Sequence, residues 1–155
     1  MLFPPQRPRF SAALRDVSAK TPRARALAAA SLADPPEGRE DEAKAGLRIL
    51  ADDPDPEVRG AALAGLGRLR DADALDLIVA RFDDGDPVVR QIAIIAAADV
   101  GDRRAVAPLV RALSDERPDV RFQAAASLAT LAPDEAARPL ARLVEDPDPE
   151  VRAQL

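Results

Sequence analysis

Apolar residues in this chain recur at intervals of three and four positions, the spacing that places side chains on one face of an α-helix. Within residues 53–82, one stripe of this kind is followed by another after a short polar break. The first stripe consists of Val58, Ala62, Leu66 and Leu69, and the second of Leu75, Ile78 and Phe82. The pattern predicts two consecutive amphipathic helices, neither of which can bury its apolar face alone.

The same pair of stripes returns twice further along the chain. In residues 84–113 it comprises Val89, Ala93, Ala97, Val100, Val106, Leu109 and Leu113. In residues 115–144 it comprises Val120, Ala124, Leu128, Leu131, Leu140 and Val144. The repetition predicts an all-α fold, an α-solenoid in which antiparallel helix pairs stack and each pair covers the apolar face of the next.

A five-residue motif, Asp-Pro-x-Val-Arg, opens these units. It stands at residues 55–59, 86–90 and 148–152, and a variant with Arg117 in place of the aspartate stands at 117–121. The four valines are 31 residues apart. Aspartate caps the free N–H groups of a helix N-terminus, and proline at the first helical position needs no N–H partner. The motif therefore predicts where each first helix starts, and Asp71, Asp102 and Asp134 are predicted to cap the second helices.

The predicted organisation is a short N-terminal segment followed by one repeat domain. Residues 1–20 are expected to form an irregular, proline-rich leader and a short capping helix at residues 11–17. The repeat domain is residues 21–155, with units at about 21–52, 53–83, 84–114 and 115–145 and a partial unit at 146–155. The partial unit favours a segment of a longer repeat protein, and the alternative is an open end that docks on a partner.

Composition narrows the functional classes. The net charge of −5 argues against non-specific binding to nucleic acid, which depends on basic patches. The chain has no cysteine and no histidine, so disulfides, thiolate nucleophiles and the commonest metal ligands are excluded, and no cofactor is expected. Neither a secretory signal nor an apolar run long enough for a membrane span is present, so a cytoplasmic location is expected. Arginine far outnumbers lysine (Lys20 and Lys44 only), which is typical of a GC-rich bacterial genome.

One stretch carries a resemblance to a known repeat family. It reads Asp53-x-x-Pro56-x-Val58-Arg59-x-x-Ala62-x-x-Gly65-Leu66-Gly67-x-Leu69 and resembles the short HEAT-like repeats of the phycobilisome-lyase type. The run from Asp102 to Leu109 resembles the second helix of that pattern. The resemblance covers about residues 21–155 and implies stacked helix pairs. It implies no single function, because such repeats occur in bilin lyases, in adaptor and scaffold proteins and in a few enzymes.

Two enzymatic relatives conflict with the composition. HEAT-like deoxyhypusine hydroxylases bind iron through His-Glu pairs, and this chain has no histidine. HEAT-like DNA glycosylases depend on aromatic and basic residues, whereas this chain is acidic and lacks Trp and Tyr. We therefore expect a non-enzymatic scaffold or adaptor that binds a protein partner on its concave face. The alternatives are a subunit of a bilin-lyase-like or chaperone-like complex that handles a cofactor, and the repeat segment of a larger regulatory protein.

The arginines of the motif form the most regular polar feature, at Arg59, Arg90, Arg121 and Arg152. Each lies in the first turn of its helix, where the helix dipole disfavours a cation, so a carboxylate should compensate. Asp53, Asp84, Asp115 and Asp146 recur with the same period. The predicted role is a structural ladder of ion pairs between neighbouring units, and a row of ligand-binding arginines is the alternative.

The second helices are expected to line the concave side, where solenoids bind their partners. Their exposed positions carry a small positive patch made of Arg104, Arg111, Arg138 and Arg142. Guanidinium groups suit carboxylates, so the patch predicts a groove for an acidic peptide or an acidic partner surface. The alternative is an ordinary solvated charged face.

Acidic clusters at residues 52–55 and 83–86 could suggest calcium. They lack the glycine turn and the closing glutamate of an EF-hand loop. Helix capping explains their positions, so no metal site is predicted. Gly65 and Gly67 follow no strand and are expected to allow close packing of helices instead of binding phosphate.

Overall fold

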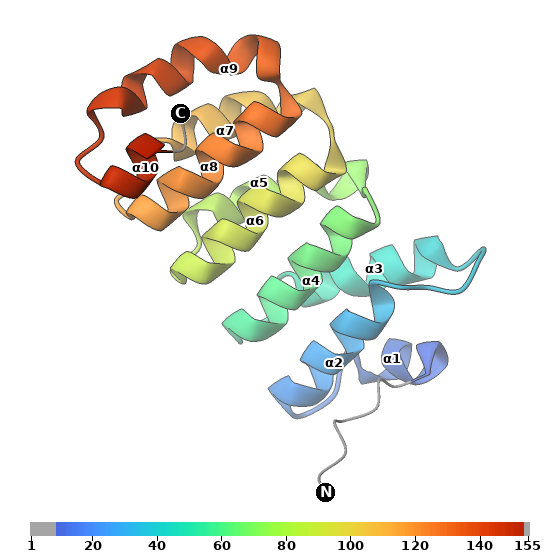
Figure 1. Ribbon diagram of the computed structural model, residues 1–155. Helices are drawn as coiled ribbons and strands as arrows, with labels where there is room; N and C mark the ends of the chain where they lie inside the picture. Colours follow the sequence, from blue (N-terminus) through green and yellow to red (C-terminus); the bar gives the residue numbers. More distant parts are fainter. Residues whose placement is uncertain (1–8, 154–155) are drawn as a thin grey trace, which may run out of the picture.

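The computed structural model describes residues 9–153 and shows an α-solenoid whose helix pairs follow one another in sequence order (Figure 1). The first helices of the pairs are α2 (Pro22–Leu32), α4 (Pro56–Arg68), α6 (Pro87–Val100), α8 (Pro118–Leu131) and α10 (Pro149–Ala153). These residues contain no β-strand. The predicted all-α solenoid is confirmed.

Every first helix begins at a proline, which is Pro22 in α2 and the motif proline in the other four. Asp55 accepts hydrogen bonds from the backbone N–H groups of Glu57 and Val58, and Asp86 caps α6 in the same way. Thr21 caps α2. Arginine cannot accept hydrogen bonds, so α8, which follows Arg117, has no side-chain cap.

The second helices are α3 (Glu40–Leu50), α5 (Leu75–Ala80) between η1 (Ala72–Ala74) and η2 (Arg81–Asp83), α7 (Val106–Ala112) after η3 (Arg103–Ala105), and α9 (Pro133–Leu140) before η4 (Ala141–Glu145). After α3, the second helices are shorter than the first helices of their units and are flanked by 3₁₀ turns. A short helix, α1 (Phe10–Asp16), precedes α2. The irregular leader predicted before it lies almost wholly outside the described residues.

The predicted caps of the second helices are only partly correct. Asp102 accepts a hydrogen bond from the Arg104 N–H at 2.9 Å, as predicted. Asp71 makes no cap, because its buried carboxylate accepts two hydrogen bonds from Arg48 instead. Asp134 makes no cap either, since α9 already begins at the residue before it.

One predicted core position is wrong. In the last second helix Leu143 is buried, whereas Val144 is 60% exposed. The segment Ala141–Glu145 is 3₁₀-helical. A 3₁₀-helix has three residues per turn instead of 3.6, which shifts the side chain that faces the core.

The helices form two layers with the core between them. We call α2, α4, α6 and α8 the inner layer, and α1, α3, α5, α7 and α9, with their 3₁₀ turns, the outer layer. The two layers meet through fully buried side chains that include Leu47, Leu63, Leu66, Ile78, Ile94, Leu109 and Leu128. This single core runs the length of the stack.

The two layers are not equally tight. Within residues 9–153, each first helix from α2 to α8 makes extensive backbone contacts with the next first helix. The second helices do not: the contacts of α3 with α5, α5 with α7 and α7 with α9 are few. A stack bends toward the layer in which its helices lie closer together, so the first helices line the concave side. The prediction that the second helices do so is wrong.

Small residues make the inner layer tight. A Cβ atom on Gly67 would lie 2.7 Å from the Ala96 Cα in the next helix, a distance that no side chain tolerates. A Cβ on Gly65 would lie 2.9 Å from the side chain of Leu47 in α3. Both glycines lie inside α4 and serve close helix packing, as predicted.

Candidate functional site

The arginine of each motif spans the boundary between neighbouring units. Nε and Nη2 of Arg59 donate hydrogen bonds to the two carboxylate oxygens of Asp84, at 2.9 and 2.7 Å. Nη1 of the same side chain donates to the carbonyl oxygens of Asp53 and Pro54, at 2.9 and 3.0 Å. Arg59 therefore ties the loop before its own helix to the corresponding loop of the next unit.

Arg121 repeats these contacts with Asp146 and with the carbonyl oxygen of Asp115. Arg90 pairs with the next unit differently, because its Nη2 donates to both Asp115 and Glu116 at 3.3 Å. Arg90 is the most buried of these arginines, 8% exposed. Nη1 of Arg152 donates to the carbonyl oxygens of the loop before its own helix. The predicted aspartates therefore face the predicted arginines, each from the following unit.

One rung of this ladder was not predicted. Nε and Nη2 of Arg25 donate to the carboxylate of Asp53 at 2.6 and 2.9 Å. The helix α2 lacks the full motif. However, Pro22 and Arg25 have the same spacing as Pro56 and Arg59, and this signal could have identified the rung.

The ladder holds its carboxylates in the charged form. Hydrogen bonds from Arg25 hold the pKa of Asp53 below its usual value. Burial raises the pKa of Asp84, but the hydrogen bonds from Arg59 and from a backbone N–H outweigh burial, and the net pKa is lowered. Hydrogen bonds from Arg121 likewise lower the pKa of Asp146. Each of these carboxylates is thus neutralised by a guanidinium within the chain.

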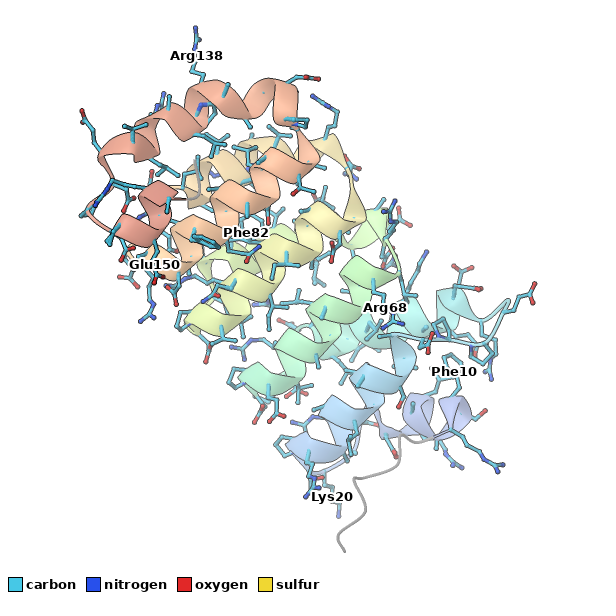
Figure 2. All side chains as sticks on the ribbon, viewed as in Figure 1. Phe10, Lys20, Arg68, Phe82, Arg138 and Glu150 are labelled. Carbon is cyan, nitrogen blue, oxygen red and sulfur yellow. The ribbon has the colours of Figure 1, made fainter. Side chains whose placement is uncertain are left out.

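The four arginines predicted to bind a partner lie in the outer layer, Arg104 in η3, Arg111 in α7, Arg138 in α9 and Arg142 in η4. The guanidinium of Arg104 donates to the Asp102 carboxylate and to the Ala72 carbonyl oxygen within the chain. Figure 2 shows Arg138 pointing away from the molecule. The role of the four in partner binding stays a prediction.

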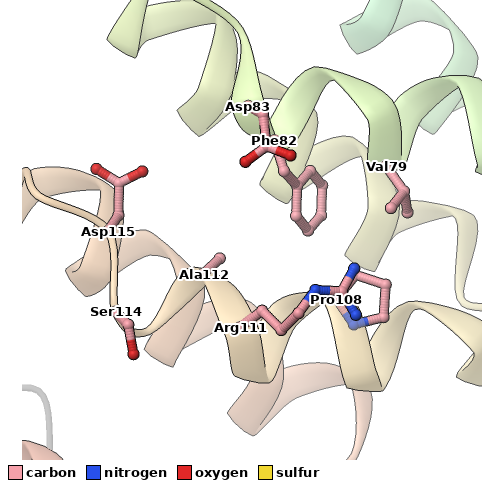
Figure 3. A pocket seen from close by; sticks show the side chains of 8 residues that line it. All are labelled: Val79, Phe82, Asp83, Pro108, Arg111, Ala112, Ser114 and Asp115. Carbon is pink, nitrogen blue, oxygen red and sulfur yellow. The ribbon is translucent and has the colours of Figure 1, made fainter.

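Arg111 lines a pocket of about 240 Å³ between η2 and α7 (Figure 3). Phe82 and Pro108 contribute apolar surface, and Asp83 and Asp115 contribute carboxylates. Asp115 is already paired with Arg90, and Asp83 balances the charge of Arg111, so the pocket has no net positive charge. This composition disfavours an acidic ligand at Arg111.

The inner layer presents a different kind of surface. Equivalent positions of α4, α6 and α8 differ in what they allow. Most buried positions change only among apolar or small residues, as at Leu63/Ile94/Ala125. The positions of Val58, Arg59 and Ala62 keep the same residue in all three helices, and they belong to the core or the ladder. Five other positions change from helix to helix: Glu57/Val88/Asp119, Gly60/Gln91/Phe122, Ala61/Ile92/Gln123, Ala64/Ile95/Ala126 and Arg68/Asp99/Thr130.

We call these five positions the variable inner face. Apart from buried Gly60, every residue in them is exposed or half-buried. Ala61 and Ile92 pack partly against the core, but packing of the stack does not fix the exposed residues of this face. Val88, Ile95 and Phe122 are exposed hydrophobic side chains of this face, 59%, 40% and 37% exposed.

Two hollows open on the variable inner face, near the N-terminal ends of the helices. The α4–α6 hollow has a volume of about 340 Å³, and its lining includes Gly60, Ala61, Val88, Ile92, Glu57 and Asp86. The α8–α10 hollow has a volume of about 390 Å³, and its lining includes Phe122, Val151, Arg117, Asp119, Asp148 and Glu150. Each is large enough to receive a bulky apolar side chain.

The residue at one variable position shapes the α4–α6 hollow. Gly60 has no side chain, and a Cβ there would lie 2.9 Å from the Ile92 Cδ1. In α6 the equivalent residue is Gln91, whose Nε2 donates to the Asp119 carboxylate at 3.0 Å. A polar bridge therefore joins α6 to α8 at the level where α4 and α6 leave an apolar hollow.

Sequence reasoning missed this face because it assigned the concave side to the second helices. A position-by-position comparison of the units would have found it. Exposed positions that change between polar and apolar residues, above a core that stays apolar or small, mark a surface whose residues the fold itself does not fix.

The geometry defines a class of protein, an α-solenoid of stacked helix pairs joined by an arginine–aspartate ladder. The family profile of HEAT repeats matches residues 8–91 and 76–155. The chain belongs to the HEAT-repeat family. No curated protein matches the sequence.

Solved structures share the fold at low sequence identity. The YibA protein of Escherichia coli has a TM-score of 0.80 and 20% identity over 94% of this chain and 56% of its own. This chain thus spans little more than half the length of that structure. A chain in the complex of CpcE and CpcF of the phycocyanin lyase from Nostoc sp. PCC7120 has a TM-score of 0.71 and 20% identity over 94% of this chain and 94% of its own. A designed armadillo repeat protein in complex with the peptide (KR)4 has a TM-score of 0.67 and 21% identity over 92% of this chain and 77% of its own.

Two further observations concern the described residues. None of their helices is both long and apolar enough to cross a membrane. They also contain no group of three or more acidic side chains placed to hold a metal ion.

Proposed function

We propose that this protein is a non-enzymatic scaffold or adaptor that binds a segment of a partner protein on its concave side, through the variable inner face. The observation that carries the proposal is that the exposed residues along α4, α6 and α8 change between polar and apolar, whereas the buried positions stay apolar or small and the ladder arginine stays the same. Exposed hydrophobic side chains cost free energy in water, and burying them against a partner recovers it.

The proposal is tested by an affinity pull-down from a lysate of the source organism with three forms of the protein. They are the wild type, an inner variant (Val88→Ser, Ile95→Ser, Phe122→Ser) and an outer variant (Arg104→Glu, Arg111→Glu, Arg138→Glu, Arg142→Glu). Circular dichroism confirms that the variants keep their helices.

We expect a partner that the wild type and the outer variant capture and the inner variant loses. Loss from the outer variant alone would instead support the acidic partner predicted for its four arginines. Retention by both variants would exclude both surfaces.

A second function is supported by one comparison. The CpcE–CpcF lyase complex resembles this chain over 94% of both chains, which favours a subunit of a lyase-like or chaperone-like complex that handles a cofactor. This function predicts that the purified protein, alone or with its captured partner, binds a bilin and changes its absorption spectrum. An unchanged spectrum in both cases would argue against it.

A further inference from the structure

The two hollows of the variable inner face share one edge of the stack. Both are bounded by the motif prolines that start the inner helices, Pro56 in one case and Pro118 in the other. The α4–α6 hollow and the α8–α10 hollow are two helix spacings apart. Packed helices lie about 8–10 Å apart, so the hollows are separated by roughly 16–20 Å.

The chemistry at this edge is acidic. Five carboxylates line the two hollows, those of Glu57, Asp86, Asp119, Asp148 and Glu150. The cation among the lining residues is Arg117, and Asp119 neutralises it through two hydrogen bonds of 3.0 and 2.9 Å.

The aspartates at this edge also cap helices. Oδ1 of Asp86 and Oδ1 of Asp148 accept backbone hydrogen bonds at the start of α6 and α10. Glu57 and Glu150 lie in the first turns of α4 and α10, where the helix dipole favours a negative charge, and both side chains are exposed. The edge therefore presents exposed carboxylates toward solvent.

Resting on the function proposed above, we infer that the partner segment is basic and extended, with one apolar side chain in each hollow. Lysine or arginine side chains between these two anchors face the carboxylates at the edge. In an extended chain, residues an even number of positions apart point to the same side, and six residues span about 20 Å. The segment thus carries its two anchors six positions apart.

The test uses a fluorescein-labelled peptide with the core Phe-Ser-Lys-Ser-Lys-Ser-Leu and measures its Kd by fluorescence anisotropy. One control peptide replaces both lysines with glutamate. A second keeps the composition but places the anchors three positions apart, so that they point to opposite sides. The protein forms are the wild type, Val88→Ser for the first hollow and Phe122→Ser for the second.

Matched control proteins carry the same type of change in the outer layer. Ile49→Ser and Val144→Ser remove side chains that are 65% and 60% exposed, on α3 and η4. Because all four positions are at least partly exposed, every variant is expected to remain folded, which a thermal melt verifies.

We expect the basic peptide to bind the wild type and both outer controls equally, and each inner variant about tenfold more weakly, as expected for loss of one buried apolar contact. Raising the salt concentration should weaken binding, because it screens the lysine–carboxylate attraction. The glutamate peptide and the three-position peptide should bind at least tenfold more weakly than the basic one.

If the glutamate peptide bound the wild type as tightly as the basic peptide, the partner segment would not be basic. If Val88→Ser and Phe122→Ser bound the basic peptide as tightly as the wild type, the two hollows would not hold its anchors. Absence of binding by the basic peptide would also overturn the inference. In each case the proposed function stands if the inner triple variant still loses its partner in the pull-down, and falls with the inference if that partner is retained.

Discussion

Arg59 makes contacts in two directions, which explains why an arginine stands at this position in every unit. Its planar fork binds both oxygens of Asp84 in the next unit, while Nη1 binds carbonyl oxygens of its own loop. A lysine could not make this set of bonds, since it has one nitrogen and no fork. The arginine therefore links its unit to the next through an ion pair and also holds the backbone of its own loop through hydrogen bonds.

Stability should depend on the charge of Asp84. Its pKa is lower in the folded chain than in the unfolded chain, so the charged carboxylate stabilises the fold above about pH 4. This contribution is lost as the pH falls through the folded pKa. We expect Asp84→Asn to reduce the free energy of unfolding by about 1–3 kcal/mol at pH 7, and the difference from the wild type to shrink below about pH 4.

Urea denaturation at pH 7 and at pH 3 measures this difference. Asp76→Asn is the matched control, because Asp76 is exposed on α5. A cost for Asp84→Asn that is the same at both pH values would show that the charge of the ladder does not stabilise the stack.

At the scale of the element, the length and the start of each helix are local matters, but the distance between helices is not. The prolines and aspartates of the motif start the inner helices wherever they occur. Gly67 and Ala96, which are 29 positions apart in the chain, then set how closely α4 and α6 approach. The small residues of the inner layer, and not the caps, bend the stack.

A methyl group at Gly67 should strain this contact. Gly67→Ala places a Cβ against the backbone of Ala96, which cannot move away as a flexible side chain could. We expect it to lower the free energy of unfolding by about 1–3 kcal/mol, the usual cost of overpacking a core. Chemical denaturation of the purified variant provides the measurement.

Gly85→Ala is the control at an open position, with no atom within 4 Å of the added Cβ and no positive φ. It should leave stability unchanged or raise it by about 0.4–1 kcal/mol, because alanine restricts the unfolded chain. If both variants were equally stable, the close approach of α4 and α6 would not limit the packing.

At the scale of the whole molecule, each unit depends on its neighbours. The core is one continuous cluster from α1 to α10, and the inner and outer helices both bury their apolar faces in it. A unit removed from the stack would expose these faces, since a repeat lacks a core of its own. The side chains of the variable inner face therefore have a fixed arrangement, because they project from helices that the core and the ladder hold in place.

Removing one central core side chain should therefore weaken the whole stack. Leu66 is fully buried between the layers, and we expect Leu66→Ala to lower the free energy of unfolding by about 2–5 kcal/mol. Asp76→Ala, on the exposed face of α5, should change it by about 0.5 kcal/mol or less. Thermal and urea unfolding followed by circular dichroism compare the two, and small, equal effects would contradict the assignment of Leu66 to the core.

The sequence alone determined the class of fold, the helix starts at the motif prolines and most of the core. These features depend on neighbours within one or two helical turns, such as Asp55 with Glu57 or Val58 with Ala62. The caps at Asp71 and Asp134 and the exposure of Val144 were predicted wrongly. At Asp71 a distant arginine, Arg48, competes for the carboxylate, whereas at Val144 a 3₁₀ turn changes the register.

Only the tertiary structure decided which layer is concave, and with it which surface we propose for a partner. That outcome depends on the spacing of helices 31 residues apart, which is set by contacts such as the one between Gly67 and Ala96. The α4–α6 hollow arises in the same way, from the missing side chain of Gly60 opposite Ile92 in the next helix. Periodicity specifies which residues share a helix face, but the size of side chains across the interface determines how two faces meet.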